Sequence, residues 1–433
     1  MKDSGLFWAK EIPKAWSINK VKYLFRSGKG LSITKDNLTE SGLPVVSYGQ
    51  IHAKTNSGTD TADELLRFVD TSYEKSFPQC KVNQFDFVFA DTSEDYDGIG
   101  NCVYKRSDNL LYAGYHSIIL KSKNKKDNRF LAYLFKTDAW RSQLRKSAFG
   151  VKVFSISQKL LLNASVILPP QKEQEKIADF LDSKCSSIDS ISSSLKEQIE
   201  VLEKYKKSLI FEAVTKGLDK DAPMKDSGIE WVGKMPEGWE LSRLQFMMKQ
   251  IKAKNTPVRT NQVLSLMKDV GVIPYEEKGN VGNKSKEDVS EYNLAFPNTL
   301  VMNCMNVLIG SVGISKYYGC VSPVYYVFKE TEGNDLRFIN YIFSTREFQK
   351  ELRKYANGIL EIRMRVSAND ILKRKIPLPP QNVQAKIADY LDSKCSAIDS
   401  AIAGKKEQIS ILAEYKKSLI YEYVTGKKEI PNS

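Results

Sequence analysis

The chain has 433 residues, of which 42% are hydrophobic and 27% charged, as is typical of a folded protein with two or more domains. Its 65 Lys and Arg residues exceed its 52 Asp and Glu residues, and the net charge of +13 favours a polyanionic partner. The six cysteines form no C-x-x-C pair, so neither a zinc site nor a disulfide framework is predicted, and reduced thiols indicate a cytoplasmic protein. No stretch approaches the roughly 18 apolar residues of a membrane span, and the N-terminus lacks the apolar core of a signal peptide.

Residues 1–25 predict a short irregular or helical head with buried tryptophans. The motif Met-Lys-Asp-Ser-Gly at residue 1 returns at residue 224, and each copy is followed by a Trp, a Pro and another Trp. Strand-like runs then occur at 45–48, 85–89, 101–104 and 116–120, separated by turn-forming residues. Residues 129–147 have the apolar spacing of one amphipathic helix, and a short strand is expected at 151–156. This first body is therefore α+β and mostly sheet.

Residues 168–218 form the most informative segment because they recur at 378–428, where about 32 of 51 aligned positions are identical. After the Leu-Pro-Pro motif, apolar residues recur every seven positions, which predicts a long helix with a coiled-coil seam in each copy. The predicted seam residues are Leu181, Cys185, Ile188, Leu195, Ile199, Leu202 and Leu209, then Leu391, Cys395, Ile398, Ile402, Ile409, Leu412 and Leu419. A helix with one apolar stripe needs a partner, and the nearest candidate is the other copy in the same chain.

The repeats predict a pseudo-two-fold molecule. We expect domains at 1–167 and 218–377, spacer helices at 168–217 and 378–426, and a tail at 427–433. The second body (241–377) contains a predicted helix near 337–355 and differs from the first almost throughout. If the two helices are antiparallel, the end of the second helix lies close to the first head. Small residues at the helix midpoints, Ser194 and Gly404, then predict a close crossing there, with surface tolerance as the alternative explanation.

No catalytic site is predicted. His52 and His116 are the only histidines, and both lie in the first body, so no histidine-based site can recur in the second. A lone His is more often structural or exposed than catalytic. No phosphate-binding loop or dinucleotide motif is present, and the acidic run 91–97 lacks the spacing of a calcium loop. We therefore expect no cofactor and no metal in this chain.

DNA binding is better supported than catalysis. Lys and Arg neutralise phosphates, whereas Asn, Gln, Arg and Ser or Thr read base edges, and such residues accompany aromatic ones in both bodies. The candidates are Ser47, Tyr48, Gln50 and Lys152 in the first body, and Asn303, Asn306, Tyr317, Tyr325, Arg353, Arg363 and Arg365 in the second. Taken singly, each is typical of a solvated surface, so the prediction depends on the duplication.

The duplicated tail motif, Leu-Pro-Pro-x-x-x-Gln followed by Ile-Ala-x-aromatic-Leu-Asp, resembles that of the specificity (S) subunit of type I restriction-modification systems. Segments 89–96, 114–117, 301–306, 310–315 and 321–325 resemble motifs of its target recognition domains. The resemblance adds Thr92, Ser93, Glu94, Tyr96, His116 and Ser322 to the candidate DNA-binding residues.

The resemblance implies an α+β fold in which two mainly β target recognition domains are joined by two long antiparallel helices. It implies a non-catalytic subunit that reads a bipartite DNA target, with one domain per half-site and the helices fixing the gap. The implied partners are double-stranded DNA, two methyltransferase subunits and ATP-driven restriction subunits. S-adenosylmethionine, ATP and Mg²⁺ are expected only in those partners. The alternative is a coiled-coil interaction scaffold with two ligand-binding heads and no DNA role.

Overall fold

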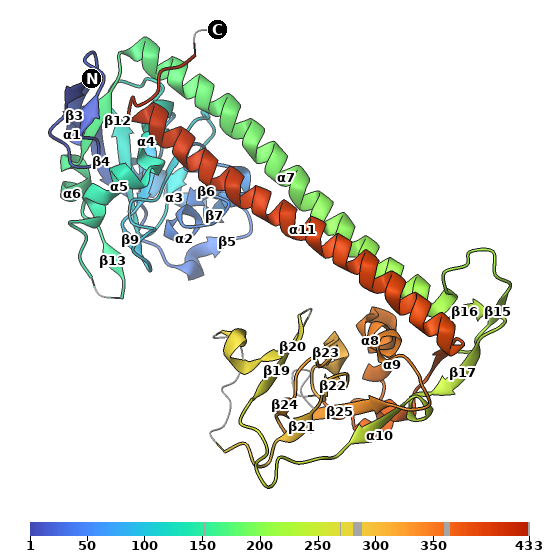
Figure 1. Ribbon diagram of the computed structural model, residues 1–433. Helices are drawn as coiled ribbons and strands as arrows, with labels where there is room; N and C mark the ends of the chain where they lie inside the picture. The colour runs from blue at the N-terminus through green and yellow to red at the C-terminus, as the bar shows by residue number, and fades with distance from the viewer. Residues whose placement is uncertain (151, 269, 280–287, 359–363, 432–433) are drawn as a thin grey trace. The chain divides into compact units, whose positions relative to one another are not determined.

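The computed structural model describes residues 1–150, 152–268, 270–279, 288–358 and 364–431 (Figure 1). The chain divides into two compact units. Unit 1 contains Met1–Ser194 and Glu407–Ser433, whereas unit 2 contains Leu195–Lys406. The two long helices, α7 (Gln171–Lys216) and α11 (Gln381–Val424), each contribute one segment to either unit.

Unit 1 is organised on a four-stranded antiparallel sheet in the order β10-β8-β12-β4. Its strands are β10 (Cys102–Tyr104), β8 (Phe87–Ala90), β12 (Ser117–Ser122) and β4 (Phe25–Lys29). Successive residues of β8 face opposite sides, so that Phe87 and Phe89 join the core under the helices, whereas Val88 and Ala90 join a second core. Burial on both faces explains why this strand is a continuous apolar run.

A smaller sheet in the order β11-β6-β7-β5 packs on the second core, through Val46 of β6 and Ala113 of β11. Its strands are β11 (Tyr112–Ala113), β6 (Leu43–Val46), β7 (Arg67–Val69) and β5 (Leu38–Thr39). The β11–β6 pair is parallel, unlike its neighbours. Strand β6 therefore ends at the same edge as β11, and this places the segments that follow them side by side.

The predicted helix at 129–147 is two helices, α4 (Arg129–Lys136) and α5 (Asp138–Arg145). The prediction of one helix was wrong because Thr137 is extended (ψ 139°) and caps α5, its side chain accepting a hydrogen bond from the Trp140 amide. The same break recurs in unit 2, where Thr345 separates α8 (Leu336–Ser344) from α9 (Arg346–Arg353). Apolar spacing runs through both breaks, so periodicity alone does not reveal them.

Unit 2 repeats the framework with a different sequence. Its four-stranded sheet has the equivalent order β23-β22-β25-β18, and two smaller pairs, β19-β20 and β21-β24, complete the unit. The strands are β23 (Val312–Ile314), β22 (Leu300–Asn303), β25 (Tyr325–Glu330), β18 (Met248–Ile251), β19 (Leu264–Met267), β20 (Gly271–Pro274), β21 (Asn293–Ala295) and β24 (Gly319–Val321). The two sheets share one topology, so unlike residues occupy equivalent positions.

Shorter elements connect these layers. Unit 1 also contains β3 (Ser17–Lys20), α1 (Val21–Leu24), α2 (Tyr48–Ile51), α3 (Ser72–Ser76), β9 (Thr92–Ser93), β13 (Phe154–Ser155), α6 (Gln158–Asn163), β14 (Ser165–Leu168), η1 (Lys35–Asn37), η2 (Asp63–Leu65) and η3 (Pro78–Cys80). Unit 2 also contains β17 (Glu240–Arg243), α10 (Ala368–Leu372), β26 (Lys375–Leu378), η4 (Leu244–Phe246), η5 (Tyr275–Lys278) and η6 (Val307–Ile309).

Each head is a two-stranded hairpin rather than a helix. The hairpins are β1 (Lys2–Asp3) with β2 (Glu11–Ile12), and β15 (Met224–Asp226) with β16 (Lys234–Pro236). The first head lies at the C-terminal end of α11, where Trp16 and the end of that helix share one core and Gly426 (φ 70°) abuts Pro13. In unit 2, Gly217 (φ 78°) meets Trp239 in the same way. The predicted proximity of the first head to the second helix is confirmed.

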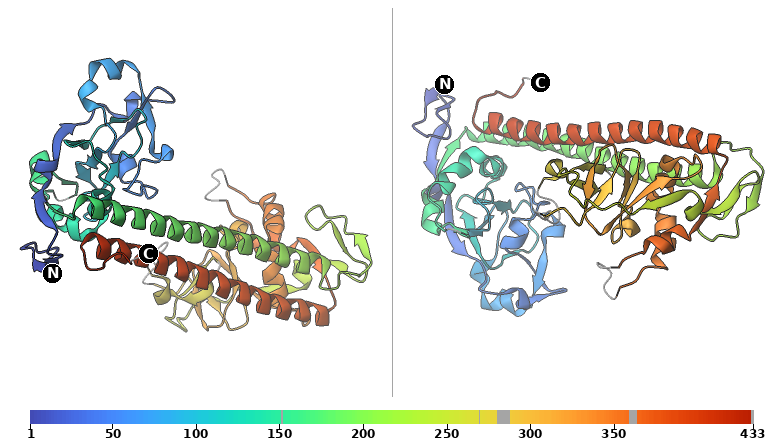
Figure 2. Two further views of the ribbon diagram at one scale, coloured as in Figure 1. Left: turned by 90° about the horizontal axis from the view of Figure 1, so that it is seen from above. Right: turned by 60° about the horizontal axis from the view of Figure 1, so that its bottom comes forward.

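Within each unit, a segment of α7 lies against a segment of α11 (Figure 2). In unit 1, Lys416 binds Asp189 at 2.6 Å, and in unit 2, Lys206 binds Asp399 at 2.7 Å. Most predicted seam residues are buried, and Leu202, Leu209, Ile409 and Leu412 are half-buried. A Cβ built on Gly404 would have no atom within 4 Å, which at that position favours surface tolerance, the alternative explanation of the small residues.

Candidate nucleic-acid interface

Polar and aromatic residues gather at one edge of unit 1, where β6 and β8 end and β12 begins. We call Tyr48, Asp91, Thr92, Tyr115 and His116 the recognition edge of unit 1. Backbone hydrogen bonds hold its loops together, since the Asp91 amide donates to the His116 carbonyl (3.1 Å) and the Tyr48 amide donates to the Tyr115 carbonyl (3.3 Å). Of this group, Tyr48, Thr92 and His116 were predicted from the sequence, and the structure brings them together.

The aromatic rings of the recognition edge contact one another edge to face. The Tyr48 ring centroid lies 5.6 Å from those of Tyr115 and His116, and 6.2 Å from that of His52. Such contacts fix ring orientations while leaving polar tips available. Preorganised side chains of this kind suit recognition, since little rotamer freedom is lost on binding.

His116 is exposed and held in an unusual backbone conformation. Its φ is 54°, a region that non-glycine residues seldom occupy and that costs about 1–3 kcal/mol. Its side chain is 57% exposed, and Nδ1 lies 3.4 Å from Oδ1 of Asp91. That oxygen is inaccessible to solvent and has no hydrogen-bond partner among the described residues. The Asp91 carboxylate therefore lies beside the His116 imidazole, most of whose side chain stays exposed.

His52, in contrast, is a structural residue. The Asn101 side-chain amide donates to its Nδ1 (3.0 Å), so the ring proton lies on Nε2, which donates to the Thr92 carbonyl (2.8 Å). Both ring nitrogens are thus occupied. The structural reading of a lone histidine holds for His52, and its role is to fix the loop that carries Thr92.

The remaining candidates of unit 1 divide into buried and exposed groups. Ser47 and Ser93 are buried, and Gln50 accepts a hydrogen bond from the Ser47 amide (3.2 Å), so we expect these three to support the edge rather than contact a ligand. Glu94 and Tyr96 lie exposed on the loop after β9. Lys152 is exposed on the hairpin that pairs with β9.

Unit 2 has a recognition edge at the equivalent place, formed by Asn303, Tyr317, Ser322 and Tyr325. Tyr317 and Tyr325 pack against the same core, and the Tyr325 amide donates to the Ser322 carbonyl (2.9 Å). Burial raises the pKa of Tyr325, while a hydrogen bond with Asn303 acts in the opposite direction. All four residues were predicted from the sequence. Asn303 is buried, whereas the two tyrosines and Ser322 are half-buried.

Other predicted residues of unit 2 lie around this edge. Asn306 is exposed just before η6, and Arg353 is exposed on α9, which packs against η6. Arg365 is exposed beside Cys304, since the Val366 amide donates to the Cys304 carbonyl (3.1 Å). The prediction for Arg363 falls outside the described residues.

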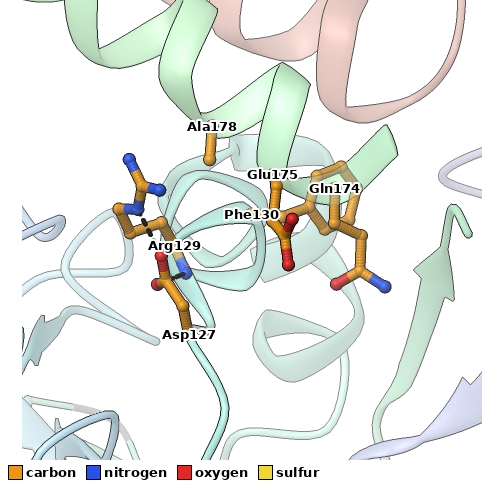
Figure 3. A pocket seen from close by; sticks show the side chains of 6 residues that line it. All are labelled: Asp127, Arg129, Phe130, Gln174, Glu175 and Ala178. Carbon is orange, nitrogen blue, oxygen red and sulfur yellow. Dashed lines mark hydrogen bonds and ion pairs between the residues drawn. The ribbon is translucent and has the colours of Figure 1, made fainter. Parts of the chain in front are cut away.

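An arginine network joins the first helix of each body to the long helix. Arg129 of α4 binds Asp127 (2.5 Å), Asp179 (2.8 Å) and Asp182 (2.7 Å), and the last two belong to the Ile-Ala-x-aromatic-Leu-Asp motif. Figure 3 shows Arg129 beside Ala178 of α7, paired with Asp127. Although burial lowers it, hydrogen bonds with these carboxylates raise the pKa of the Arg129 guanidinium.

Unit 2 reproduces the network residue for residue. Arg337 binds Asp335 (2.6 Å), Asp389 (2.7 Å) and Asp392 (3.0 Å). A tyrosine hydroxyl also donates to the last aspartate of each motif, Tyr133 to Asp182 (2.8 Å) and Tyr341 to Asp392 (2.6 Å). The motif therefore fixes α4 to α7 in unit 1 and α8 to α11 in unit 2.

The sequence reasoning missed Asp91, Tyr115 and the arginine network. Asp91 follows a buried strand directly, and an acidic residue at that point was the available signal. The aspartates of the tail motif recur at an offset of 210 residues, and Arg129 and Arg337 lie in the first turn of matching helices, which together could have revealed the network. Among the described residues, no group of three or more His, Cys, Asp or Glu could hold a metal ion. The described helices include none with the length and apolar character of a membrane span.

Two copies of one framework with unlike polar edges define a protein that carries two different binding domains. Residues 13–201 and 236–410 match the family described as "Type I restriction modification DNA specificity domain". The chain therefore belongs to that family, which confirms the resemblance seen in the sequence. The predicted mixed fold with two such domains and a long helix is confirmed as well.

Individual relatives agree with this assignment. The chain is 26% identical over 428 residues to a putative type I restriction enzyme specificity subunit, MjaX, of Methanocaldococcus jannaschii, covering 96% of this chain and 94% of the relative. It is 22% identical over 210 residues to the EcoKI specificity subunit of Escherichia coli, covering 48% and 44%.

Two solved structures share the fold. A chain from a study of complex assembly and conformational transition of the type I R-M system has a TM-score of 0.69 at 15% identity, covering 96% of this chain and 100% of that one. The HsdS subunit from Thermoanaerobacter tengcongensis has a TM-score of 0.55 at 15% identity, covering 96% and 98%.

Proposed function

We propose that this chain is the DNA specificity subunit of a type I restriction-modification complex and reads a bipartite target, one half-site per unit. The observation that carries the proposal is the difference between the two edges at equivalent positions. The backbone bond from Asp91 to His116 recurs from Cys304 to Val324 (3.2 Å), so a carboxylate and an imidazole are replaced by a thiol and an isopropyl group. The same backbone framework thus carries different side chains at equivalent positions of the two units, as recognition of two unlike half-sites requires.

The same proposal gives the paired helices the role of a spacer. The ion pairs Asp189–Lys416 and Lys206–Asp399 are equivalent under the 210-residue offset, as expected for an antiparallel, pseudo-two-fold coiled coil within one chain. We propose target recognition domains at 1–167 and 218–377 and spacer helices at 168–217 and 378–426. The separation between the half-sites then follows from the length of the helices.

The long helices carry two equivalent pairs of exposed apolar residues, and these pairs support the binding of two copies of one partner. Val201 and Tyr205 of α7 are 63% and 53% exposed, and the equivalent Ile411 and Tyr415 of α11 are 60% and 54% exposed. Residues four apart share a helix face, so each unit carries one such pair. We assign these faces to two methyltransferase subunits, with restriction subunits joining the assembly.

This subunit has a non-catalytic role in the proposal. Methylation of adenine and ATP-dependent cleavage belong to the partner subunits, as do their S-adenosylmethionine, ATP and Mg²⁺. The complex acts on cellular DNA, which is consistent with a cytoplasmic location. A coiled-coil scaffold with no DNA role is the competing function.

The test uses the chain reconstituted with its methyltransferase subunit. Sequencing of methylated sites first gives the target, and binding of a duplex with that target is then measured from low to high salt. We expect specific binding whose logarithm falls linearly with the logarithm of salt concentration, because Lys and Arg displace counterions from phosphates. Exchanging residues 241–377 for those of a relative should change one half-site only. A complex that assembles but binds no duplex would support the scaffold, and a change in both half-sites would contradict one unit per half-site.

A further inference from the structure

Each four-stranded sheet carries two basic side chains directly opposite each other on adjacent strands. In unit 1, Arg26 of β4 lies opposite Lys121 of β12, and in unit 2, Lys249 of β18 lies opposite Lys329 of β25. We call these the two basic pairs. Residues directly opposite share one face of a sheet, with Cβ atoms about 5 Å apart, so like charges there destabilise it. Each pair joins the second residue of the outer strand to the next-to-last residue of its neighbour, so the two pairs are equivalent.

Protection of a sheet edge explains only half of each pair. Charged side chains on an edge strand prevent it from pairing with another chain. Strands β4 and β18 are the outermost strands of their sheets, so this explanation covers Arg26 and Lys249 (Figure 1). It does not cover Lys121 and Lys329, because β12 and β25 each pair with a strand on both sides. The inner lysine of each pair therefore adds repulsion without protecting an edge, which indicates a ligand of opposite charge.

The basic pair of unit 2 has little compensation within the chain. Both of its lysines are exposed, and neither side chain forms a hydrogen bond or an ion pair with any described residue. In unit 1, Nζ of Lys121 donates to the Gln79 carbonyl (2.7 Å). Burial raises the pKa of the Asp86 carboxyl in that unit, and the charge of Lys121 opposes this rise. Thr299 occupies the place of Asp86 in unit 2, so a neutral hydroxyl replaces the carboxylate there.

The distance from each pair to its recognition edge suits the backbone of DNA. Lys121 and Lys329 each lie four residues beyond the first residue of their strand, which adjoins the recognition edge. At about 3.4 Å per residue, this separation is about 14 Å. It is close to the width of the major groove, about 12 Å, which separates the two lines of phosphate that border the bases. Phosphate contacts carry no sequence information, so two units that read unlike bases can share them.

The residue types favour phosphate over a protein surface. Lysine is depleted in protein interfaces, whereas it neutralises phosphates along nucleic acids. Three of the four residues in the basic pairs are lysines. A further exposed lysine follows three residues later on each outer side, at Lys29 in unit 1 and Lys252 in unit 2. The repeated feature is therefore positive charge, as a polyanionic ligand requires.

We propose that each basic pair binds backbone phosphates of DNA beside the half-site read by its own unit. The inference rests on the proposed function. Each lysine or arginine of a pair neutralises one phosphate, and the negative charge of the phosphates offsets the repulsion between the two cations. The contact is the same in both units and independent of sequence, whereas the recognition edges differ.

The experiment measures duplex binding by the reconstituted methyltransferase complex from about 50 to 200 mM salt. The double variant Lys249→Gln, Lys329→Gln removes the basic pair of unit 2. Each neutralised phosphate contributes about 0.9 to the slope of log affinity against log salt, so the slope of the variant should be smaller by about 1.8. Over this fourfold range of salt, the wild type should therefore lose about 12-fold more affinity than the variant. The methylated sequence should not change, and binding to unrelated duplex should weaken by the same factor.

The matched control is the double variant Lys220→Gln, Lys234→Gln. These lysines are exposed in unit 2 outside the four-stranded sheet, so the same charge is removed elsewhere and the slope should equal that of the wild type. Hydrogen exchange of the free protein gives a second readout. Amides of β18 should exchange more slowly in the basic-pair variant than in the wild type, because like charges no longer face each other.

The outcomes separate the possible roles of the basic pair. An unchanged salt slope would overturn the proposal, and faster exchange of β18 alongside it would assign the pair a structural role. Loss of methyltransferase assembly in the basic-pair variant, with assembly kept in the control, would assign the pair to a protein interface instead. If the wild-type complex bound no duplex at any salt concentration, the proposed function itself would fail, and this inference with it.

Discussion

The arginine networks give the sharpest prediction because the two copies differ in burial. The Arg129 side chain is 15% exposed, whereas that of Arg337 is 39% exposed. The substitutions Arg129→Ala and Arg337→Ala remove the same three ion pairs from equivalent places. Any difference between the two variants therefore reports the environment of the network rather than its chemistry.

The expected cost follows from the carboxylates left behind. In unit 1, Asp127 and Asp182 are 30% and 23% exposed, and after the substitution each keeps other partners, Tyr104 for the first and Arg106 and Tyr133 for the second. Weakening two partly buried acceptors in this way lowers the free energy of local opening of α4 by about 3 kcal/mol. In unit 2, Asp389 and Asp392 are 69% and 47% exposed, so water screens them. Asp335 is 16% exposed and keeps the hydrogen bond from the backbone amide of residue 337, so one partly buried acceptor is weakened and the cost is about 2 kcal/mol.

Hydrogen exchange resolves α4 and α8 separately, so each variant is compared with the wild type at its own site. A difference of about 1 kcal/mol corresponds to roughly fivefold faster exchange through local opening of α4 in Arg129→Ala than of α8 in Arg337→Ala. Arg129→Lys keeps the charge but cannot bridge three carboxylates, so its exchange should be intermediate. Equal protection losses in the two units, or unchanged protection of α4, would refute this reasoning.

Two further predictions concern the long helices. Inserting seven residues at matched points of α7 and α11 lengthens each helix by about 10 Å, so the methylated target should gain about three base pairs of spacer. If methylome sequencing showed the same number of base pairs between the half-sites, the helices would not set that separation. The variants Tyr205→Ser and Tyr415→Ser should each lower the number of bound methyltransferase subunits from two to one by native mass spectrometry. If both variants still bound two methyltransferase subunits, these exposed pairs would not be the methyltransferase-binding surface.

Repetition made the overall organisation predictable, because a segment that recurs with a seven-residue apolar period must form the same element twice. The break at Thr137 was not predictable from that pattern, since apolar spacing continues through it while the side chain caps the next helix. Buried strands such as 87–90 were recognisable because both faces are covered. Sequence patterns therefore report which side of an element is buried better than where the element ends.

In the candidate site, too, some residues were predictable from the sequence and others were not. Tyr48, Thr92 and His116 were predicted from residue type and from the resemblance, and they lie together. Asp91 was missed because its significance depends on a neighbour in space: its carboxylate reaches His116, which is 25 residues away in the chain. Ser47 and Ser93 have a suitable chemistry for DNA, yet they are buried. Burial of a polar loop residue depends on how strands from distant segments meet, and local sequence does not encode that.

Unit 1 is completed by Glu407–Ser433, and this has a consequence for the order in which the protein folds. Leu419, Ile420 and Tyr423 cover the same core as Trp8 and Trp16, so a nascent chain cannot close that core until roughly 230 further residues follow Ser194. At ribosomal rates of about 5–20 residues per second, the delay is roughly 10–50 s. Unit 2, whose residues are contiguous, can close earlier. The body synthesised first is thus finished last, and during translation it is the part of the chain most exposed to proteases and most dependent on chaperones.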